Sequence, residues 1–452
     1  MPSLSMQKLL VGVKNVLRNP LIRNMMIVGG ASLLVKLVAF YKETLVAGSF
    51  GLSDILDTFF IAILVPSFIQ HVFIGALKNI FIPNYILELK EGGDKGRFQA
   101  VVFLITAGIA LFSVIIAYLS TDTFLDLVFP GHTDEYYELI KKQLFILLPC
   151  LFFWGFSSLI SGLLDMANRF LISTIFPVIS ALTVIVFLLF FKEELGETVL
   201  AKGALTGAFI EFTFLFIVSS RLKDLKIGKP ALSKNINLMI RQLPPKVSSG
   251  FLSGMNNFVD QFFAAQLAVG SITAINYGIK IPAFMVSILI LALGNVLLPH
   301  FSRLITDDIQ KAYNQLFNIL KIVFLGAAVV TIGAFIFSND IISLLFERKE
   351  FTAEDTQIVG RVQRIIFIYV PFYLCTLILV KFLTSINKNK FMAWTSLFNL
   401  IMNIVLNIIL VKKYDLYGLA MSTTIVYIIS SFIYFSYTYR QYRVSLASTN
   451  DS

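Results

Sequence analysis

The stretch that decides the fold is AILVPSFIQHVFIGALKNIFIPNY, residues 62–85, because GIKIPAFMVSILILALGNVLLPHF, residues 278–301, echoes it at a constant spacing. Both stretches are long and apolar, so we expect the two halves of the chain to be copies of one another. Transporters built from such repeats enclose their substrate path between the repeats, near the bilayer midplane. The matched pairs are Pro66 and Pro282, Phe68 and Phe284, Ala76 and Ala292, Leu77 and Leu293, Asn79 and Asn295, and Pro83 and Pro299.

The composition predicts a chain embedded in a membrane. Of 452 residues, 57% are hydrophobic and 14% are charged, and the mean hydropathy is +0.81. A soluble protein of this size needs a more polar surface. A helix crosses the hydrocarbon core with about 20 residues, and continuous apolar runs of this length favour helices over barrel strands. About twelve spans are predicted, at 22–49, 55–82, 98–120, 138–164, 169–191, 200–220, 242–269, 272–299, 313–337, 358–386, 389–410 and 415–441.

Six spans in each half give the two copies the same orientation. The expected fold is therefore an all-α polytopic membrane protein with two parallel six-helix lobes around a central cavity. Basic residues gather in the segments that are cytoplasmic if both termini are inside, which predicts that orientation. The expected parts are an amphipathic cytoplasmic segment at 1–21, an N-lobe at 22–220, a basic linker at 221–241, a C-lobe at 242–441 and a cytoplasmic tail at 442–452.

Several function classes are disfavoured. The net charge of +10 follows from the inside bias of the basic residues, so we expect no nucleic-acid partner. Cys150 and Cys375 both lie in predicted spans, which argues against a disulfide framework. The three histidines have no metal-ligand spacing, so neither a metal nor another cofactor is expected. The chain lacks a phosphate-binding loop, which argues against direct ATP drive.

Charged side chains inside the spans are the candidate functional residues. An ionisable group near the bilayer centre costs at least about 2.5 to 3.5 kcal/mol, so it normally faces a protein or water-filled interior. We expect these residues to line a shared cavity. The candidates are Lys36, Lys42, Asp57, His71 and Lys280 for substrate binding, and Glu43, Glu211 and Asp260 for coupling or charge balance.

Each candidate has an alternative role. Lys36 and Glu43 lie seven residues apart on one helix face, about 10 Å apart, too far for an ion pair. Lys36 is thus left for an anionic ligand, although an internal salt bridge is the alternative for Lys36 and Lys280. Lys42 points about 100° away from Glu43 and lies near the interface, where snorkelling is its alternative.

The acids and the histidine also leave two interpretations open. Asp57 stands near a helix start, where capping is at least as good an explanation as transport. His71 lies in an otherwise apolar stretch that is typical of a packing residue. Glu211 and Asp260 suit either a coupling cation or an interhelical hydrogen bond.

Four segments resemble the MurJ/MviN lipid II flippases, members of the superfamily that also holds Wzx polysaccharide flippases and MATE multidrug exporters. The first two are DTFFIAILVPSF and GALKNIFIP. The others are NNFVDQFFAAQLAVGSITAINYGIKIPAF and LALGNVLLPHFSR. The resemblance extends over most of the twelve-helix core as a pattern, and it implies a bacterial cytoplasmic-membrane transporter.

The resemblance also implies a diphosphate site. Lys36, Lys42 and Lys280 stand where the family has arginines, and Glu43 and Asp57 stand where it has acids. Lysine is a compact charge rather than a bidentate fork, so the phosphate geometry must differ from the family's. Two family arginines are replaced by Gln70 and His71, and the chain ends after the twelfth span, whereas family members usually carry two more. These departures favour a polyprenyl-diphosphate-linked glycan other than lipid II.

The expected function is a flippase for a polyprenyl-diphosphate-linked saccharide, lipid II or a related lipid-linked oligosaccharide, working by alternating access. A proton, a sodium ion or the membrane potential is expected to drive it. The expected partners are this lipid, membrane lipids and glycan-assembly enzymes. Two alternatives stay open: a cation-coupled multidrug exporter of the MATE kind, and a membrane glycosyltransferase or ligase acting on the same lipid.

Overall fold

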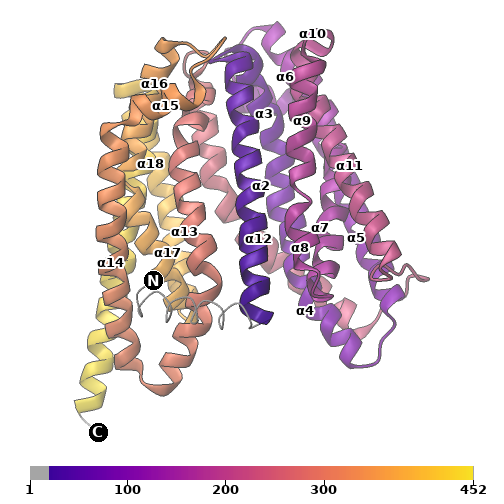
Figure 1. Ribbon diagram of the computed structural model, residues 1–452, viewed down its shortest axis with the longest axis vertical. Coiled ribbons are helices and arrows are strands. Elements are labelled where there is room, and N and C mark those ends of the chain that lie inside the picture. Colours follow the sequence, from indigo (N-terminus) through magenta and orange to yellow (C-terminus); the bar gives the residue numbers. More distant parts are fainter. Residues whose placement is uncertain (1–19, 451–452) are drawn as a thin grey trace, which may run out of the picture.

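The computed structural model describes residues 20–450, and the chain forms two sets of helices that lie side by side (Figure 1). The first set, called the N-lobe here, occupies residues 20–221. Its long apolar runs form helices because a backbone in lipid must satisfy its own hydrogen bonds. It comprises α2 (Pro20–Phe50), α3 (Asp54–Ile69), the π-helix η1 (Gln70–Ile74), α4 (Gly75–Lys90), α5 (Lys95–Val128), α6 (Asp134–Leu147), α7 (Cys150–Met166), α8 (Phe170–Ile175), α9 (Val178–Phe190), α10 (Lys192–Leu195), the 3-10 helix η2 (Gly196–Thr198) and α11 (Val199–Arg221).

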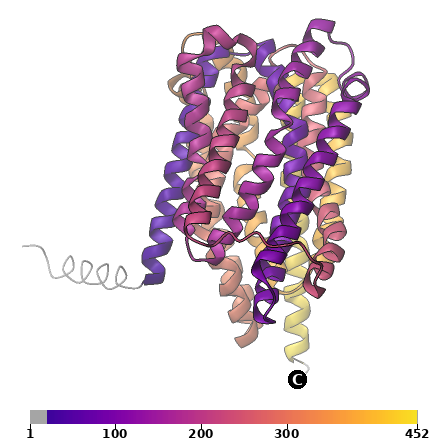
Figure 2. The same cartoon turned by 90° about the vertical axis from the view of Figure 1, so that its right-hand side faces the viewer.

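The second set, the C-lobe, occupies residues 234–450. Figure 2 shows it behind the N-lobe, with the helices of both sets running in nearly the same direction. The last helix bends at Asp415, whose φ is 47°. Its members are α12 (Lys234–Ala265), α13 (Ser271–Asp307), α14 (Ile309–Ile336), α15 (Ser338–Phe346), α16 (Ala353–Phe367), α17 (Val370–Ser385) and α18 (Asn389–Asn450).

The predicted all-α membrane fold is confirmed. Each predicted span coincides with a helix or a closely spaced run of helices, although some boundaries differ by eight or nine residues. Among residues 20–450, eight such helices are long and apolar enough to cross a bilayer, or nine if the bent pair α16 and α17 is one span. The sequence predicted about twelve spans. Part of the difference arises because α18 is one helix that covers two predicted spans, which meet at its bend at Asp415.

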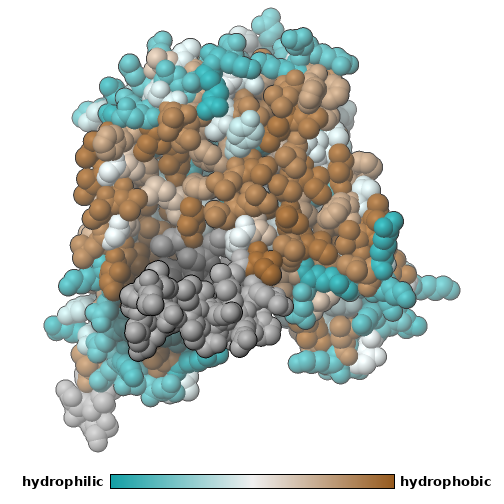
Figure 3. Space-filling view, viewed as in Figure 1, coloured by the Kyte–Doolittle hydropathy of each residue, from teal (hydrophilic) through white to brown (hydrophobic). Residues whose placement is uncertain are grey.

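The surface matches a bilayer. Figure 3 shows a hydrophobic band across the middle of one face of the molecule, between hydrophilic ends. Large apolar side chains such as Leu119 and Ile322 are more than two thirds exposed, at 74% and 71%. Exposed apolar area on this scale is stable only against lipid or another protein. One end of the band carries the linker between the lobes and is called the linker end; the other is called the far end.

The lobes are joined at the far end by a buried carboxylate. Asp57, in the first turn of α3, is 2% exposed. It accepts hydrogen bonds from the backbone N–H of Gly270 at 2.7 Å and of Thr273 at 2.8 Å, and from the Thr273 hydroxyl at 2.5 Å. A carboxylate at a helix start satisfies N–H groups that have no partner within the helix. Asp57 therefore caps α13 from the other lobe.

A second far-end contact requires a glycine. Gly51 has φ of +56°, and a Cβ there would collide with the Glu350 carbonyl. The Glu350 N–H donates to the Gly48 carbonyl at 3.2 Å. The end of α2 thus packs directly against the backbone of the loop between α15 and α16, and side chains larger than hydrogen have no room there.

The linker end is held by α12, which belongs to the C-lobe by sequence but packs against α4 of the N-lobe. Asn84 donates to the Gln242 side chain at 2.8 Å. The buried Glu88 accepts from Ser233 at 2.9 Å and from Asn235 at 2.8 Å. Ser233 also caps α12 by accepting from the Ile236 N–H. This cap starts α12 at Lys234, so the predicted linker is too long: its residues 234–241 belong to the helix.

The segment predicted at residues 1–21 lies almost wholly outside the described residues.

The capping role of Asp57 predicts a large effect of one substitution on stability. Asp57→Ala leaves two buried backbone N–H groups without an acceptor, and we expect it to lower the free energy of unfolding by about 1 to 3 kcal/mol. Asp54→Ala, in the same turn but exposed, is the matched control. Thermal unfolding of both variants in detergent is the measurement. Equal melting temperatures for the two would contradict the capping role.

Candidate functional site

The helices of the N-lobe surround a cavity of about 640 Å³, called the N-lobe cavity. Of the C-lobe side chains that the structure describes, that of Lys280 on α13 reaches into it. The described part of the wall combines five charged residues with serines and aromatic rings. Its polar lining consists of Lys42, Glu43, Gln70, Lys78, Ser157, Ser158, Ser161, Ser180, Glu211 and Lys280.

Glu43 is the central group of this wall. Its Oε1 lies 2.8 Å from Lys42 Nζ, and its Oε2 lies 2.9 Å from Lys280 Nζ. All three side chains are mostly buried, with 16% to 28% of each exposed. One carboxylate therefore neutralises two ammonium groups, and the second pair joins the two lobes. Three charges at this spacing leave a net positive site at membrane depth.

The pairing of Lys42 with Glu43 corrects the expectation from helical spacing. Adjacent side chains on a helix point about 100° apart, so Lys42 and Glu43 were expected to face different surroundings. The four-carbon lysine stem is flexible enough to bring its ammonium back across the helix surface. The energy of pairing a partly desolvated carboxylate favours that rotamer over snorkelling to the interface.

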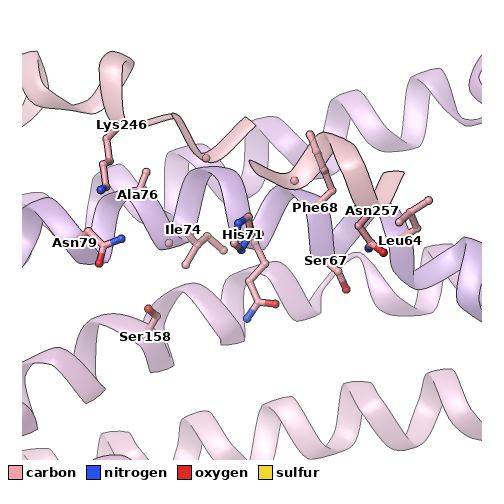
Figure 4. A pocket seen from close by; sticks show the side chains of 14 residues that line it. Leu64, Ser67, Phe68, His71, Ile74, Ala76, Asn79, Ser158, Lys246 and Asn257 are labelled. Carbon is pink, nitrogen blue, oxygen red and sulfur yellow. The ribbon is translucent and has the colours of Figure 1, made fainter. Parts of the chain in front are cut away.

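A second cavity, of about 800 Å³, lies between the lobes and is called the interlobe cavity. Figure 4 shows Lys246 of α12 facing Asn79 across it, with His71 farther along the wall. Gln70 and Ser158 line both cavities, so the two adjoin. His71 is thus placed beside the N-lobe cavity, in the interlobe cavity.

Helix rise orders these groups along the molecule. At about 1.5 Å per residue, Glu43 lies about 10 Å from the far end of α2 and Lys280 about 14 Å from the far end of α13. Lys78 lies about 36 Å from the far end of α3, counted through the continuous run to α4. The lining lysines therefore extend from the linker end to the depth of Glu43.

Three of the eight candidates, Lys36, Asp57 and Asp260, lie outside both cavities. Lys36 on α2 is half-buried, lines neither cavity, and has no ion pair or hydrogen bond with any described residue. Asp57 is sealed into its capping contact with α13. The structure therefore assembles Lys42, Glu43, Lys280 and Glu211 around one cavity, places His71 in the next, and leaves Lys36 and Asp57 outside both.

Asp260 forms a separate polar cluster inside the C-lobe. Its carboxylate accepts from the side-chain amides of Asn403 at 3.1 Å and Asn407 at 3.2 Å, and from the Thr423 hydroxyl at 3.2 Å. The Asn407 Oδ1 is buried and has no hydrogen-bond partner in the described structure. The cluster joins α12 to both halves of α18.

Sequence reasoning missed Lys78 and Lys246, which it counted among the cytoplasmic basic residues. Both fall inside predicted spans, at 55–82 and 242–269. The rule that intramembrane charges face an interior was sufficient to identify them. The lining serines carry no comparable signal, because serine is common on membrane helices.

A model of the lipid II flippase MurJ family matches residues 46–450. A probable lipid II flippase MurJ of Rickettsia prowazekii is 24% identical over 94% of this chain and 85% of its own length. The corresponding protein of Vibrio cholerae is 26% identical over 93% and 82%.

Solved structures agree with these relatives. Lipid II flippase MurJ in an inward closed conformation superposes with a TM-score of 0.78 and 25% identity, covering 91% of this chain and 87% of that one. An inward-facing MATE multidrug transporter gives 0.73 with 12% identity, covering 93% and 98%, a likeness of fold alone. By the match to nine tenths of its residues, the chain belongs to the lipid II flippase MurJ family.

Proposed function

We propose that the protein moves a polyprenyl-diphosphate-linked saccharide, lipid II in particular, from the cytoplasmic to the outer leaflet by alternating access. The observation that carries the proposal is the N-lobe cavity, in which Lys42 and Lys280 share the single carboxylate of Glu43. Family membership supports lipid II over other lipid-linked glycans. On this proposal the protein is a transporter and catalyses no covalent reaction.

The chemistry of the headgroup explains the need for this site. A diphosphate cannot enter hydrocarbon without losing its hydration, and the cost of an unpaired ion there is many kcal/mol. The ammonium groups of Lys42 and Lys280 replace the lost water with charge-assisted hydrogen bonds. The polyprenyl tail stays in lipid, so only the headgroup needs the cavity.

The route begins at the linker end, which the distribution of basic residues assigns to the cytoplasm. Lys78 and Lys246 line the cavities nearest that end, and they attract the anion before it reaches Lys42 and Lys280. The headgroup passes from the interlobe cavity to the N-lobe cavity where Gln70 and Ser158 line both. Rocking of the lobes then exposes the site to the other leaflet.

Glu43 supplies the means of release. The carboxylate and the diphosphate compete for the same two ammonium groups, and each displaces the other. Binding is therefore weaker than two free lysines would give, which lets the headgroup leave after the lobes have moved. A site that bound the anion without competition would hold it too tightly for turnover.

Coupling is proposed at Asp260. Its carboxylate is surrounded by two carboxamides and a hydroxyl, and a carboxamide that turns over presents an oxygen in place of its N–H. The cluster thus suits a proton or a sodium ion, each of which neutralises the carboxylate. Because it joins α12 to α18, the bound cation changes packing beside the interlobe cavity, which α12 lines.

The first test compares lysines inside and outside the cavity. In proteoliposomes carrying lipid II, Lys42→Gln and Lys280→Gln are each expected to slow flipping at least about tenfold, since each removes a charge-assisted contact to the diphosphate. Lys36→Gln, on the same helix as Lys42 but outside both cavities, is expected to cost less. Leaflet exposure of the headgroup is the readout. Equal losses at positions 36 and 280 would refute this assignment of the site.

The competition by Glu43 makes a separate prediction. Glu43→Gln frees both ammonium groups, so the variant should bind lipid II more tightly and turn over more slowly. Equilibrium binding and flipping rate are measured on the same preparation. Weaker binding in the variant would show that Glu43 holds the lysines in place for the substrate instead of competing with it.

Coupling at Asp260 is tested with ion gradients. The flipping rate of the unaltered protein should rise with a sodium or proton gradient across the proteoliposome membrane. Asp260→Asn should flip slowly and show no response to either gradient. Asp340→Asn, exposed in the first turn of α15, is the control and should respond normally. A gradient response that survives in Asp260→Asn excludes this residue as the coupling site.

A further inference from the structure

Glu211 is an acid without a counter-ion on the wall of the N-lobe cavity. It lies on α11 and is 7% exposed. In the part of the chain that the structure describes, neither a basic side chain nor a hydrogen-bond donor contacts its carboxylate. Asp57 is buried, and Asp260 and Glu43 are half-buried; each of these three acids has several partners. Glu211 therefore has unused capacity to bind a cation.

The serine hydroxyls on the wall of the same cavity also lack hydrogen-bond partners among the described residues. Hydroxyls inside the helices of this chain commonly donate to the carbonyl one turn earlier, as Thr106 and Thr121 do. None of the four serines on this wall forms that bond or any other with a described residue. These serines are Ser157, Ser158 and Ser161 on α7 and Ser180 on α9. The Ser157 hydroxyl oxygen is shielded from the cavity, and the hydroxyls of the other three are free to serve a ligand.

The fold brings these groups to one side of the cavity. Both α7 and α9 pack against α11. Gly207, one turn before Glu211, approaches Ser180 so closely that a Cβ would lie 3.0 Å from its hydroxyl oxygen. Helix rise places Glu211 about 18 Å from the far end of α11, close to the depth of Lys280. An acidic, hydroxyl-lined wall thus lies near the depth of the basic pair.

We propose that Glu211 and these serines form a subsite for an ammonium group on the translocated headgroup. This proposal rests on the proposed function and adds a specificity to it: the substrate carries an amine as well as a diphosphate. An ammonium group has three N–H donors, which one carboxylate and two hydroxyl oxygens satisfy. The diphosphate binds Lys42 and Lys280 while the amine binds Glu211, so the headgroup is held at two points.

The size of the cavity favours an organic ammonium over a free alkali ion. A bare ion needs a close shell of oxygens, whereas this space of about 640 Å³ is in the range that holds small organic groups. It also adjoins the interlobe cavity, from which a saccharide with its substituents can enter. The charges on its wall complement a headgroup that is negative at one point and positive at another.

The test uses two diphosphate-linked polyprenyl saccharides that differ only by acetylation of one amine on the headgroup. The unaltered protein should flip the free-amine lipid about tenfold faster than the acetylated lipid, the effect of one charge-assisted hydrogen bond. Glu211→Gln should lower the ratio to about one, because it slows the free-amine lipid far more than the acetylated lipid. Glu211→Asp, which keeps the charge, should retain part of the preference. Glu197→Gln, an exposed acid outside the cavity, is the control.

Each other outcome has a definite meaning. No preference in the unaltered protein, or a preference that survives in Glu211→Gln, overturns the subsite. Equal slowing of both lipids in Glu211→Gln assigns the residue a general role and also overturns it. A dependence on Glu211 that appears only with added sodium, equally for both lipids, assigns the site to a free ion and rejects the ammonium. Failure of the unaltered protein to flip either lipid contradicts the proposed function itself.

Discussion

The shared ion pair of Glu43 is the interaction on which the rest of the site depends. It brings one lysine from each lobe to the same carboxylate, at a depth where neither lysine is stable alone. It therefore does two things at once: it fixes α13 against α2, and it keeps two ammonium groups ready for an anion. An ion pair buried this way adds little to net stability, because desolvation offsets most of the attraction. Its value lies in positioning the charges.

The bilayer explains why the other acids inside the lobes differ in role. A carboxylate in hydrocarbon must be satisfied by donors or by a cation. Asp57 is satisfied by three donors of α13 and serves as a joint between the lobes. Asp260 is satisfied by amides and a hydroxyl that rotate, which makes it suitable for exchange with a cation. Glu211 has no such donors among the described residues, so a ligand is the remaining source.

Much of the fold followed from the sequence, and the reason is physical. Length, hydropathy and the repeated stretch at 62–85 predict membrane helices in two related sets, since backbone satisfaction in lipid allows few other structures. Most charged residues of the cavity walls were also identified, because charge inside a span is rare, although Lys78 and Lys246 were missed. Capping by Asp57 and a salt bridge of Lys280 stood among the alternatives, but the partners of these side chains were not predictable. Asp57 finds its partners on the other lobe, and Lys42 reaches Glu43 through a flexible side chain that helical angles do not describe.

The two repeats also differ in a way that pattern matching does not detect. Residues 70–74 form the π-helix η1, whereas the matching residues 286–290 lie within the continuous α-helix α13. A π-turn shifts the register of the residues that follow it, and such turns are frequent at functional sites. Here Gln70 lines both cavities and His71 lines one. On α12, Gly250 approaches this turn so closely that a Cβ would lie 3.2 Å from the Val72 carbonyl oxygen. The symmetry of the fold thus provides two lobes that can rock, and the break in that symmetry places polar groups where the two cavities adjoin.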